Sequence, residues 1–306
     1  MAVLAVDAGG ARIKLAVVEN ASVLARATLD AQSEMGLKER LPAITATLHE
    51  LVPAGLTIDG LGMAFPSLTE GDRVIGSVGK FVDAETLDLA AWTRKEFGVP
   101  FAIDNDARLA TVGEWVAGVG RGANDLVMVT LGTGIGTGVI LDGCVLRGHH
   151  GAAGILGGHM TANIGGRACA CGNIGCWETE ASTTALPEMA KQQAAFEKSI
   201  LRSGDLDYAA VFAAAAVGDE CATRLRAISL RVWGALAVSL VHAYDPELLI
   251  FGGGVLGSGE SVLGSIRHDV DCHAWPQVRI EVSALGDDAA VIGCEWLLKS
   301  RAEQRG

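Results

Sequence analysis

Three cysteines and one histidine form the strongest cluster of reactive side chains in this sequence. Cys169, Cys171 and Cys176 fall within eight residues, and His159 lies ten residues before the first of them. Three thiolates and an imidazole make a closed tetrahedral ligand set that suits a structural Zn²⁺ ion, and the glycines at 172 and 175 let the loop wrap an ion. Free or redox-active thiols are the alternative, but packing alone rarely brings three cysteines so close. The spacing therefore predicts a structural zinc site.

The other four cysteines, Cys144, Cys221, Cys272 and Cys294, lie in apolar segments, and we expect them to be small core residues. Thiolate ligands persist in a reducing compartment, which favours a cytoplasmic location. The opening MAVLAVDAGG has no cationic segment before its apolar residues, so a secretory signal is not expected. No uninterrupted apolar stretch approaches the roughly 20 residues of a membrane span.

Two glycine-rich turns, each after a short apolar segment, could bind phosphate groups. Gly9 and Gly10 form the first turn, and Gly132, Thr133 and Gly134 form the second. A glycine turn brings backbone N–H groups close to a phosphate because no side chain stands in the way. Two turns with matched flanks favour a phosphate site over the alternative of two ordinary hairpins.

Charged residues flank the first turn. Asp7 ends the first predicted strand, where it could organise Mg²⁺ or a water of Mg²⁺, since a hard cation that bridges phosphates takes carboxylate and water oxygens. Lys14, on the next strand, could offset phosphate charge. The alternatives are a turn-forming aspartate and a solvated strand lysine, and the residues alone leave them open.

A further polar group, Asp104-Asn105-Asp106, lies between a predicted strand and a predicted helix. Side chains at such a position project from the carboxyl end of a sheet, where α/β proteins bind ligands. Asp106 could instead be the N-cap of the helix that begins at Ala107, because Asp and Asn both cap helices well. The residue types do not decide between the two roles.

These groups need a scaffold, and the apolar pattern predicts one in which strands alternate with helices. A strand, a glycine turn and a second strand open the chain, and the same pattern opens again near Leu126, which predicts an α/β fold with a duplicated phosphate-binding lobe. Strands are predicted at residues 2–8, 13–20, 22–30, 58–65, 99–103, 126–131, 138–141 and 246–254, and helices at 37–51, 87–97, 107–116, 224–244 and 288–298.

Length and charge limit the possible functions. A chain of 306 residues, half of them hydrophobic, is large enough for two cores that face a cleft. The 24 basic and 36 acidic residues give a net charge of -12, and the sequence has no basic patch. Such a chain repels a phosphate backbone, so nucleic acid is not expected as a partner.

Taken together, these segments resemble the ROK family of sugar kinases, within the larger actin-like ATPase group, over essentially the whole chain. Asp7-Ala-Gly-Gly-Ala-Arg-Ile-Lys14 is similar to the first phosphate motif of the family, and Leu131-Gly-Thr-Gly-Ile-Gly-Thr-Gly138 to the second. Phe251-Gly-Gly-Gly254 is similar to the segment near adenosine, and His159 with the three cysteines and Trp177-Glu178 is similar to the zinc and sugar signature.

The resemblance implies a fold and a reaction. The fold is a two-lobed, ribonuclease H-like α/β fold with duplicated βββαβαβα units around a cleft and a zinc loop. The reaction is transfer of the γ-phosphate of ATP, with Mg²⁺, to a hydroxyl of a small sugar or polyol. Members include zinc-containing glucokinases, N-acylhexosamine kinases and fructokinase-like proteins, and dimers are common, so a cytoplasmic homodimer is expected.

The resemblance also implies residue roles, and it favours catalysis at Asp106. By its motif, Asp106 is the general base, Asn105 binds the sugar, and His159 and Glu178 are sugar contacts. His159 gives one ring nitrogen to zinc and offers the other to the sugar, so zinc orients the imidazole without activating water. The nucleotide contacts it implies are Asp7, Gly9, Gly10, Lys14, Gly132, Thr133, Gly134, Gly253 and Gly254.

Three departures from the family pattern fall near the expected site. Leu156 stands three residues before His159, where the family has a glutamate that grips sugar hydroxyls, so an acceptor other than plain glucose is expected. Ser77-Val78-Gly79-Lys80 lacks an asparagine that is common in the family, and Ala11 replaces a threonine. The catalytic carboxylate is kept, so altered specificity is expected, not loss of activity.

Two other functions compete with an ATP-dependent kinase. The family includes transcriptional repressors that keep the sugar pocket, but those carry a DNA-binding module before it, and the first predicted strand here begins at residue 2. A kinase that uses polyphosphate would call for more basic residues at the cleft mouth. We expect residues 1–118, joined by the C-terminal helix 287–306, to form a small lobe, and residues 119–286 a large lobe.

Overall fold

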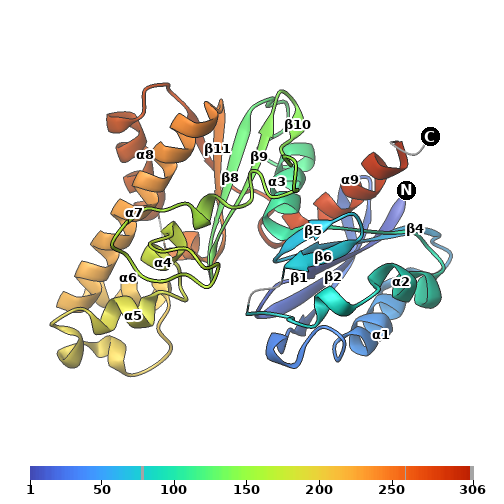
Figure 1. The fold of residues 1–306 in the computed structure, drawn as a ribbon, viewed down its shortest axis with the longest axis horizontal. Helices are drawn as coiled ribbons and strands as arrows, with labels where there is room; N and C mark the ends of the chain where they lie inside the picture. The colour runs from blue at the N-terminus through green and yellow to red at the C-terminus, as the bar shows by residue number, and fades with distance from the viewer. Residues whose placement is uncertain (77–78, 259, 304–306) are drawn as a thin grey trace. The chain divides into compact units, whose positions relative to one another are not determined.

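The computed structural model describes residues 1–76, 79–258 and 260–303, and the chain forms two compact units (Figure 1). Unit 1 consists of Met1–Ala123, Gly138–Ile155 and Ser283–Gly306. Unit 2 consists of Asn124–Thr137 and Leu156–Val282. The predicted lobes differ from these units chiefly at residues 138–155, which were expected in the second lobe and belong to unit 1.

The sheet of unit 1 has the strand order β3-β2-β1-β4-β7. Strands β1 (Ala2–Ala8), β2 (Arg12–Glu19) and β3 (Ser22–Asp30) form an antiparallel meander. Strands β4 (Ile58–Phe65) and β7 (Phe101–Asn105) extend the sheet in parallel. A separate hairpin pairs β5 (Leu68–Glu70) with β6 (Arg73–Gly76).

Helices cover both faces of this sheet. Helices α1 (Leu41–Leu51) and α2 (Leu89–Phe97) contribute to one core, and α3 (Asp106–Ala117) and α9 (Ala289–Glu303) contribute to the other. Every residue of β1 is buried as a result. A strand covered on both faces is apolar along its length, which is why the sequence predicts β1 correctly.

The second sheet repeats the order of the first. Its order is β10-β9-β8-β11-β12, which matches the first sheet when β8 corresponds to β1. β11 lies parallel to both β8 and β12, and β10 is antiparallel to β9. The predicted duplication is therefore confirmed. The strands are β8 (Leu126–Leu131), β9 (Ile135–Leu141), β10 (Cys144–Val145), β11 (Leu248–Gly252) and β12 (Arg279–Val282).

Unit 2 is built around its longest helix, α7 (Glu220–Tyr244). This helix is long and apolar enough to cross a membrane by length and composition alone. Its Leu225, Trp233 and Leu240 are buried, however, and the Trp233 indole donates to the carbonyl of Ala181 at 3.0 Å, so α7 fits a core helix. The other helices are α4 (Trp177–Ala181), α5 (Leu186–Lys191), α6 (Tyr208–Ala216) and α8 (Glu260–His273).

Short 3-10 helices connect these elements. Those of unit 1 are η1 (Ser33–Met35), η2 (Ala84–Thr86) and η7 (Gly286–Asp288). Those of unit 2 are η3 (Gly157–His159), η4 (Phe196–Lys198), η5 (Ile200–Arg202) and η6 (Gly254–Ser258).

Three element boundaries differ from the predictions for local reasons. Helix α1 begins at Leu41 and not at Leu37, because the Asp83 carboxylate accepts the N–H groups of Leu37 at 2.6 Å and Lys38 at 2.9 Å and holds them in a turn. Strand β7 begins after Pro100, which has no N–H to donate to a sheet ladder. The long helix α7 begins four residues before its predicted start, at Glu220, where Asp219 caps it through the N–H of Ala222.

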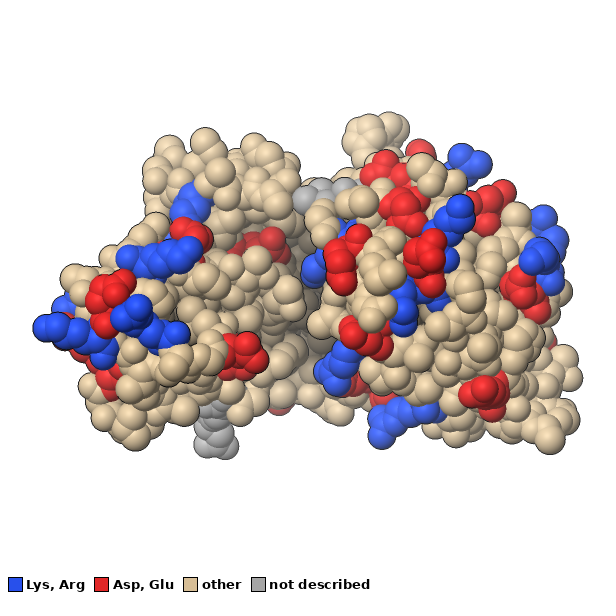
Figure 2. Space-filling model, turned by 90° about the horizontal axis from the view of Figure 1, so that it is seen from below, with Lys and Arg blue, Asp and Glu red and all other residues tan. Residues whose placement is uncertain are grey.

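Charged side chains are mixed on the surface that Figure 2 shows. Lys and Arg lie among Asp and Glu, and no continuous basic area is drawn on that face.

Helices α3 and α9 approach each other through paired glycines. A Cβ atom at Gly113 would lie 2.0 Å from the backbone oxygen of Ala289, and one at Gly293 would lie 2.1 Å from that of Leu109. Backbone oxygens cannot move aside as a flexible side chain can. The absence of a side chain at both positions therefore sets the distance between the two helices.

We expect Gly293→Ala to destabilise the protein by about 1–3 kcal/mol, because the added methyl group forces α3 and α9 apart. Gly264→Ala is the matched control: Gly264 is also the fifth residue of its helix, α8, and no atom lies near its added Cβ. Helix propensity alone should make that change neutral or stabilising by up to about 1 kcal/mol. Urea unfolding of both variants measures this, and equal effects would contradict the close contact.

Candidate active site and zinc loop

The carboxylate of Asp7 lies at the end of β1 and is held by a lysine. Asp7 and Lys14 are directly opposite each other on β1 and β2, and Lys14 Nζ is 3.3 Å from Asp7 Oδ2. The same Nζ is 2.8 Å from Oδ1 of Asp287. Asp287 lies in the C-terminal segment of unit 1, which follows unit 2 in the chain. Lys14 is therefore paired with two carboxylates.

Asp106 is the first residue of α3, and it does not cap that helix. The N-cap is Asn105, whose Oδ1 accepts the N–H of Arg108 at 3.1 Å, while its Nδ2 donates to the Ser67 carbonyl at 3.3 Å. Asp106 Oδ1 accepts the N–H of the next residue, Ala107, at 2.7 Å. The capping alternative left open for Asp106 is thus filled by its neighbour, and Asp106 is available for another role.

The carboxylates of Asp7 and Asp106 act on each other. Burial raises the pKa of Asp7 to about 6; Lys14 opposes this shift, and the negative charge of Asp106 adds to it. Burial also raises the pKa of Asp106, against its backbone hydrogen bond and the positive charges of Lys80 and Lys14. Two carboxylates in one desolvated place, flanked by lysines, are typical of a site that binds a divalent cation or phosphate.

A third carboxylate, Asp104, organises the chain around α3. It is buried, and both Arg108 and Arg147 form ion pairs with it. Arg108 also donates to the carbonyls of Gly151 at 2.5 Å and Ala153 at 3.1 Å. Sequence reasoning missed both arginines: the four-residue spacing of Asp104 and Arg108 was a local signal for the first, whereas nothing local in the sequence pairs residue 147 with residue 104. Together they fix segment 147–153 against the start of α3.

The first glycine turn is as tightly built as its sequence indicates. A Cβ atom at Gly9 would lie 2.7 Å from the carbonyl oxygen of Arg12, and one at Gly10 would collide with the side chain of Lys80. Ser33 Oγ donates to the Gly10 carbonyl at 3.0 Å. Asp7, Gly9, Gly10, Lys14, Asn105 and Asp106 thus all lie in unit 1.

The second glycine turn lies in unit 2 together with Glu178. Gly132 N–H donates to the Gly134 carbonyl at 3.0 Å, which closes the turn. Glu178 Oε2 accepts the N–H of Ile135 at 2.9 Å, and a Cβ atom at Gly134 would lie 2.3 Å from that oxygen. Glu178 was predicted only as a sugar contact, but the structure also ties it to this turn.

Two neighbouring segments complete the second turn. Thr184, which sequence reasoning missed, donates from N and Oγ1 to the Thr133 carbonyl, at 3.2 and 2.7 Å. Gly253 has φ +94, and a Cβ atom there would lie 2.2 Å from the Leu131 oxygen, while nothing lies near Gly254. The predicted adenosine segment and the second phosphate turn therefore meet at the ends of β11 and β8.

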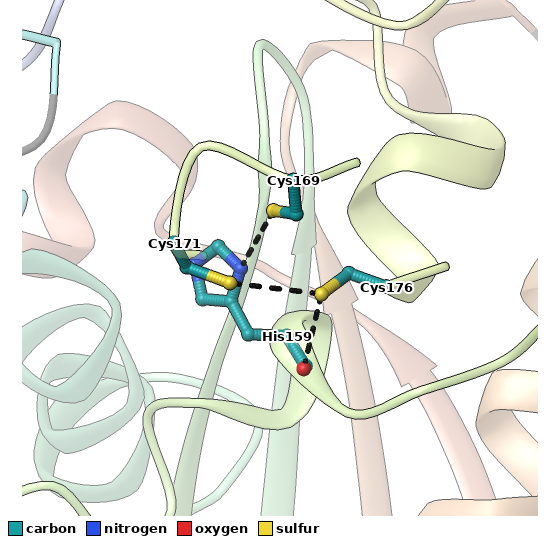
Figure 3. Close-up of side chains that lie close together, drawn as sticks. All are labelled: His159, Cys169, Cys171 and Cys176. Atoms are coloured by element: carbon teal, nitrogen blue, oxygen red, sulfur yellow. Dashed lines mark hydrogen bonds between the residues drawn. The ribbon is translucent and has the colours of Figure 1, made fainter. Parts of the chain in front are cut away.

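The predicted zinc ligands come together in the structure. The ligand atoms of His159, Cys169, Cys171 and Cys176 all lie within 4.8 Å of one another. The side chains of the four residues point toward one another (Figure 3). His159 Nδ1 is 3.6 Å from Cys169 Sγ, and Cys171 Sγ is 3.7 Å from Cys176 Sγ. A tetrahedral ion with Zn–S distances of about 2.3 Å places its ligand atoms roughly 3.8 Å apart, so these four residues fit zinc.

The structure also fixes the orientation of His159. It lies in η3, where the preceding glycines press against β9: a Cβ atom at Gly158 would lie 2.0 Å from the Ile135 carbonyl oxygen. Asn173 Nδ2 donates to the His159 carbonyl at 3.1 Å and to Cys176 Sγ at 3.4 Å. Because Nδ1 faces the cysteines, Nε2 is the ring nitrogen that stays available for another partner.

The structure corrects one expectation, which concerns the cysteines outside the cluster. Cys221 and Cys294 are buried as predicted, but Cys144 and Cys272 are exposed, so the prediction that they are core residues is wrong. Both lie in elements with one solvent-facing side, which an apolar local composition does not reveal. Ser77 and Val78, which were noted for the missing asparagine, lie outside the described residues. Leu156 is 41% exposed and not part of a core.

Comparison with known proteins identifies the family. The model of the ROK family matches residues 3–301. This chain belongs to the ROK family. The predicted family and the predicted actin-like α/β fold are therefore confirmed.

Individual relatives cover nearly the whole chain. The glucokinase of Halalkalibacterium halodurans is 29% identical over an alignment of 318 positions that covers 97% of this chain and 94% of the relative. A ROK family glucokinase from Streptomyces griseus, in complex with glucose and AMPPNP, has a TM-score of 0.82 at 28% identity and covers 98% of this chain and 100% of its own. The xylose repressor of Bacillus spizizenii is 30% identical over 245 residues, 79% of this chain and 60% of the repressor.

We expect Cys171→Ser to reduce the bound zinc from about one ion per chain to a small fraction, because one of the four ligands is lost. The free energy of unfolding should fall by on the order of 3 kcal/mol, since metal binding and folding are coupled. Elemental analysis and thermal unfolding measure the two effects. Cys272→Ser, at an exposed cysteine outside the cluster, is the control and should change neither. A zinc-free wild-type protein would contradict the site.

Proposed function

We propose that this protein is a sugar kinase that transfers the γ-phosphate of ATP to a hydroxyl of a small sugar or polyol. The observation that carries the proposal is Asp106: it begins α3, Asn105 caps the helix in its place, and its buried carboxylate interacts electrostatically with Asp7, Lys14 and Lys80. A ROK family glucokinase of known structure, similar along the whole chain, binds glucose and AMPPNP. The cytoplasmic location and the homodimer stay predictions.

In the proposed reaction, Asp106 acts as general base. The acceptor hydroxyl oxygen forms a bond to the γ-phosphorus as the bond from that phosphorus to the oxygen of ADP breaks, and the hydroxyl proton passes to the Asp106 carboxylate. The raised pKa of Asp106 makes it a better proton acceptor than an exposed aspartate. Most of the acceleration comes from positioning and electrostatics, as in other phosphoryl transfers.

The phosphate groups would be held by the two glycine turns, Gly9-Gly10 and Gly132-Thr133-Gly134, with adenosine near Gly253 and Gly254. Asp7 supplies oxygen ligands of the type that Mg²⁺ prefers, and its raised pKa reflects a carboxylate that a cation would stabilise. When bound, Mg²⁺ offsets charge on the phosphate oxygens. Lys14 holds Asp7 in place through the ion pair across β1 and β2.

The acceptor would be bound by Asn105, His159 and Glu178. Zinc serves the pocket indirectly, because it fixes the imidazole of His159 with Nε2 available to a sugar hydroxyl. Asn105 is itself held by its bonds to Arg108 and Ser67, so its position is set before the acceptor binds.

Leu156 limits which acceptor fits. Its side chain is exposed and can form no hydrogen bond, whereas the glutamate of the family pattern would accept one from a sugar hydroxyl. A hydroxyl left unpaired against it costs about 1–3 kcal/mol. We therefore infer an acceptor that lacks a hydroxyl there, or carries an apolar or acyl group in its place, in preference to plain glucose.

A screen of ADP release with ATP and Mg²⁺ tests the proposed function. The acceptors are hexoses, N-acylated hexosamines, ketoses, and cyclitols with their keto forms. The proposal is supported if at least one compound raises the rate of ADP release above the rate measured without acceptor. Sugar binding by calorimetry with no ADP release for any compound would instead support a sensor, and release from polyphosphate but not ATP would correct the donor.

We expect Asp106→Ala to lower kcat by about 10²–10⁴-fold, with little change in stability, because the base is lost and the cap is not. Asp88→Ala is the control: Asp88 caps α2 through the N–H of Ala91 at 2.8 Å, so its loss should cost about 1 kcal/mol of stability and no activity. Steady-state kinetics and urea unfolding report both. A loss of rate below tenfold for Asp106→Ala would mean that Asp106 is not the base.

We expect Leu156→Glu to raise kcat/KM for glucose by roughly tenfold or more, because the carboxylate pairs a hydroxyl that leucine leaves unpaired. Met160→Glu, at a similarly exposed apolar residue four positions on, adds the same charge and should give no gain. The measurement is kcat/KM for glucose relative to the best acceptor of the wild type. No change in this ratio would count against Leu156 as a specificity residue.

A further inference from the structure

The side chain of Lys80 lies directly on the first glycine turn. A Cβ atom built at Gly10 would meet Lys80 Cε at 2.4 Å and its Cδ and Nζ at 2.5 Å. The lysine thus occupies the space that a side chain at residue 10 would fill. Lys80 comes from a different part of the chain, between β6 and η2; its segment was noted in the sequence for a missing asparagine, but no role was predicted for the lysine itself.

The backbone next to Lys80 is firmly anchored. Phe81 is completely buried, its N–H donates to the Ser33 carbonyl at 3.0 Å, and its ring packs 5.9 Å from that of Phe65. Ser33 in turn donates from Oγ to the Gly10 carbonyl at 3.0 Å. Ser33 therefore connects Gly10 with Phe81, the residue that follows Lys80, and this fixes the backbone beside the lysine.

The two lysines near Asp7 and Asp106 differ in their partners. Lys14 forms ion pairs with both Asp7 and Asp287. Among the described residues, no carboxylate lies within the 4.0 Å ion-pair distance of Lys80 Nζ, although its charge lowers the pKa of Asp106 from farther away. The positive charge of Lys14 is already balanced, whereas that of Lys80 is available to an anion.

We propose that Lys80 is a catalytic residue that binds the γ-phosphoryl group of the nucleotide during transfer. The inference rests on the proposed kinase function, on the position of Lys80 over the glycine turn, and on the absence of a carboxylate at ion-pair distance among the described residues. Its ammonium group would donate to the oxygens of the transferring phosphoryl group, where negative charge is spread in the transition state. Lys80 neither gives nor takes a proton, since the proton passes from the acceptor to Asp106.

Binding measurements separate contact with the γ-phosphate from a structural role. Lys80→Met keeps the length of the side chain and removes its charge. We expect this variant to bind Mg²⁺-AMPPNP about tenfold or more weakly than the wild type, and to bind Mg²⁺-ADP with unchanged affinity, because only AMPPNP has a γ-phosphate. Calorimetry gives both constants. Equal weakening of AMPPNP and ADP binding would indicate a role in shaping the turn and would overturn the proposal.

Kinetics provide a second, independent readout. With the best acceptor from the screen, kcat of Lys80→Met should fall roughly 100-fold with little change in the KM of the acceptor, and Lys80→Arg should recover part of the loss. Lys95→Met, at an exposed lysine of α2 paired with Glu96, is the matched control and should match the wild type. A kcat within threefold of the wild type for Lys80→Met would overturn the proposal.

The two proposals fail in different ways. A wild-type protein that binds no nucleotide and releases no ADP contradicts the kinase function itself. A wild-type protein that is active, together with an unimpaired Lys80→Met variant of normal thermal stability, leaves the kinase function standing and removes Lys80 from it.

Discussion

Burying carboxylates at the carboxyl ends of β1 and β7 is the constraint on which unit 1 depends. An unpaired buried carboxylate is costly, so each one needs a counter-charge or hydrogen-bond donors. Asp104 is surrounded by Arg108 and Arg147, and Asp7 by Lys14, while Asp106 has a backbone N–H and the more distant charge of Lys80. The degree of compensation thus falls from Asp104 to Asp106, and the least compensated carboxylate is the one proposed to take a proton.

The helix that carries Asp106 is fixed from several sides. Its N-terminus is capped by Asn105, its first turn is fixed by Arg108, and its glycines bring it close to α9. Farther along, the buried Glu114 accepts hydrogen bonds from Ser283 Oγ at 2.6 Å and from the N–H of Leu285 at 2.8 Å, at the segment that leads into α9. A side chain on a helix held by this many contacts changes position little, as the proposed role of Asp106 in phosphoryl transfer would require.

Unit 2 uses a different means to hold its side chains. Segment 157–176 contains few buried apolar residues, and the exposed Ile164 and Ile174 cannot stabilise it by packing. The cluster of four candidate zinc ligands, the glycines packed against β9 and the hydrogen bonds of Asn173 take the place of a core there. The result is a loop in which His159 has a fixed ring orientation, although the loop has almost no regular secondary structure.

The sequence alone determined the features that depend on local spacing. The zinc ligands, the glycine turns and the repeated strand order were predicted because each is encoded within a few residues or in a repeated apolar pattern. Only the tertiary structure decided how the charges are paired. In the folded chain Asn105 caps α3, Lys14 forms an ion pair with the distant Asp287, and the side chain of Lys80 lies against Gly10. The physical reason is that electrostatic and steric contacts depend on distance in space, and residues 14 and 287, or 10 and 80, come together only when the chain folds.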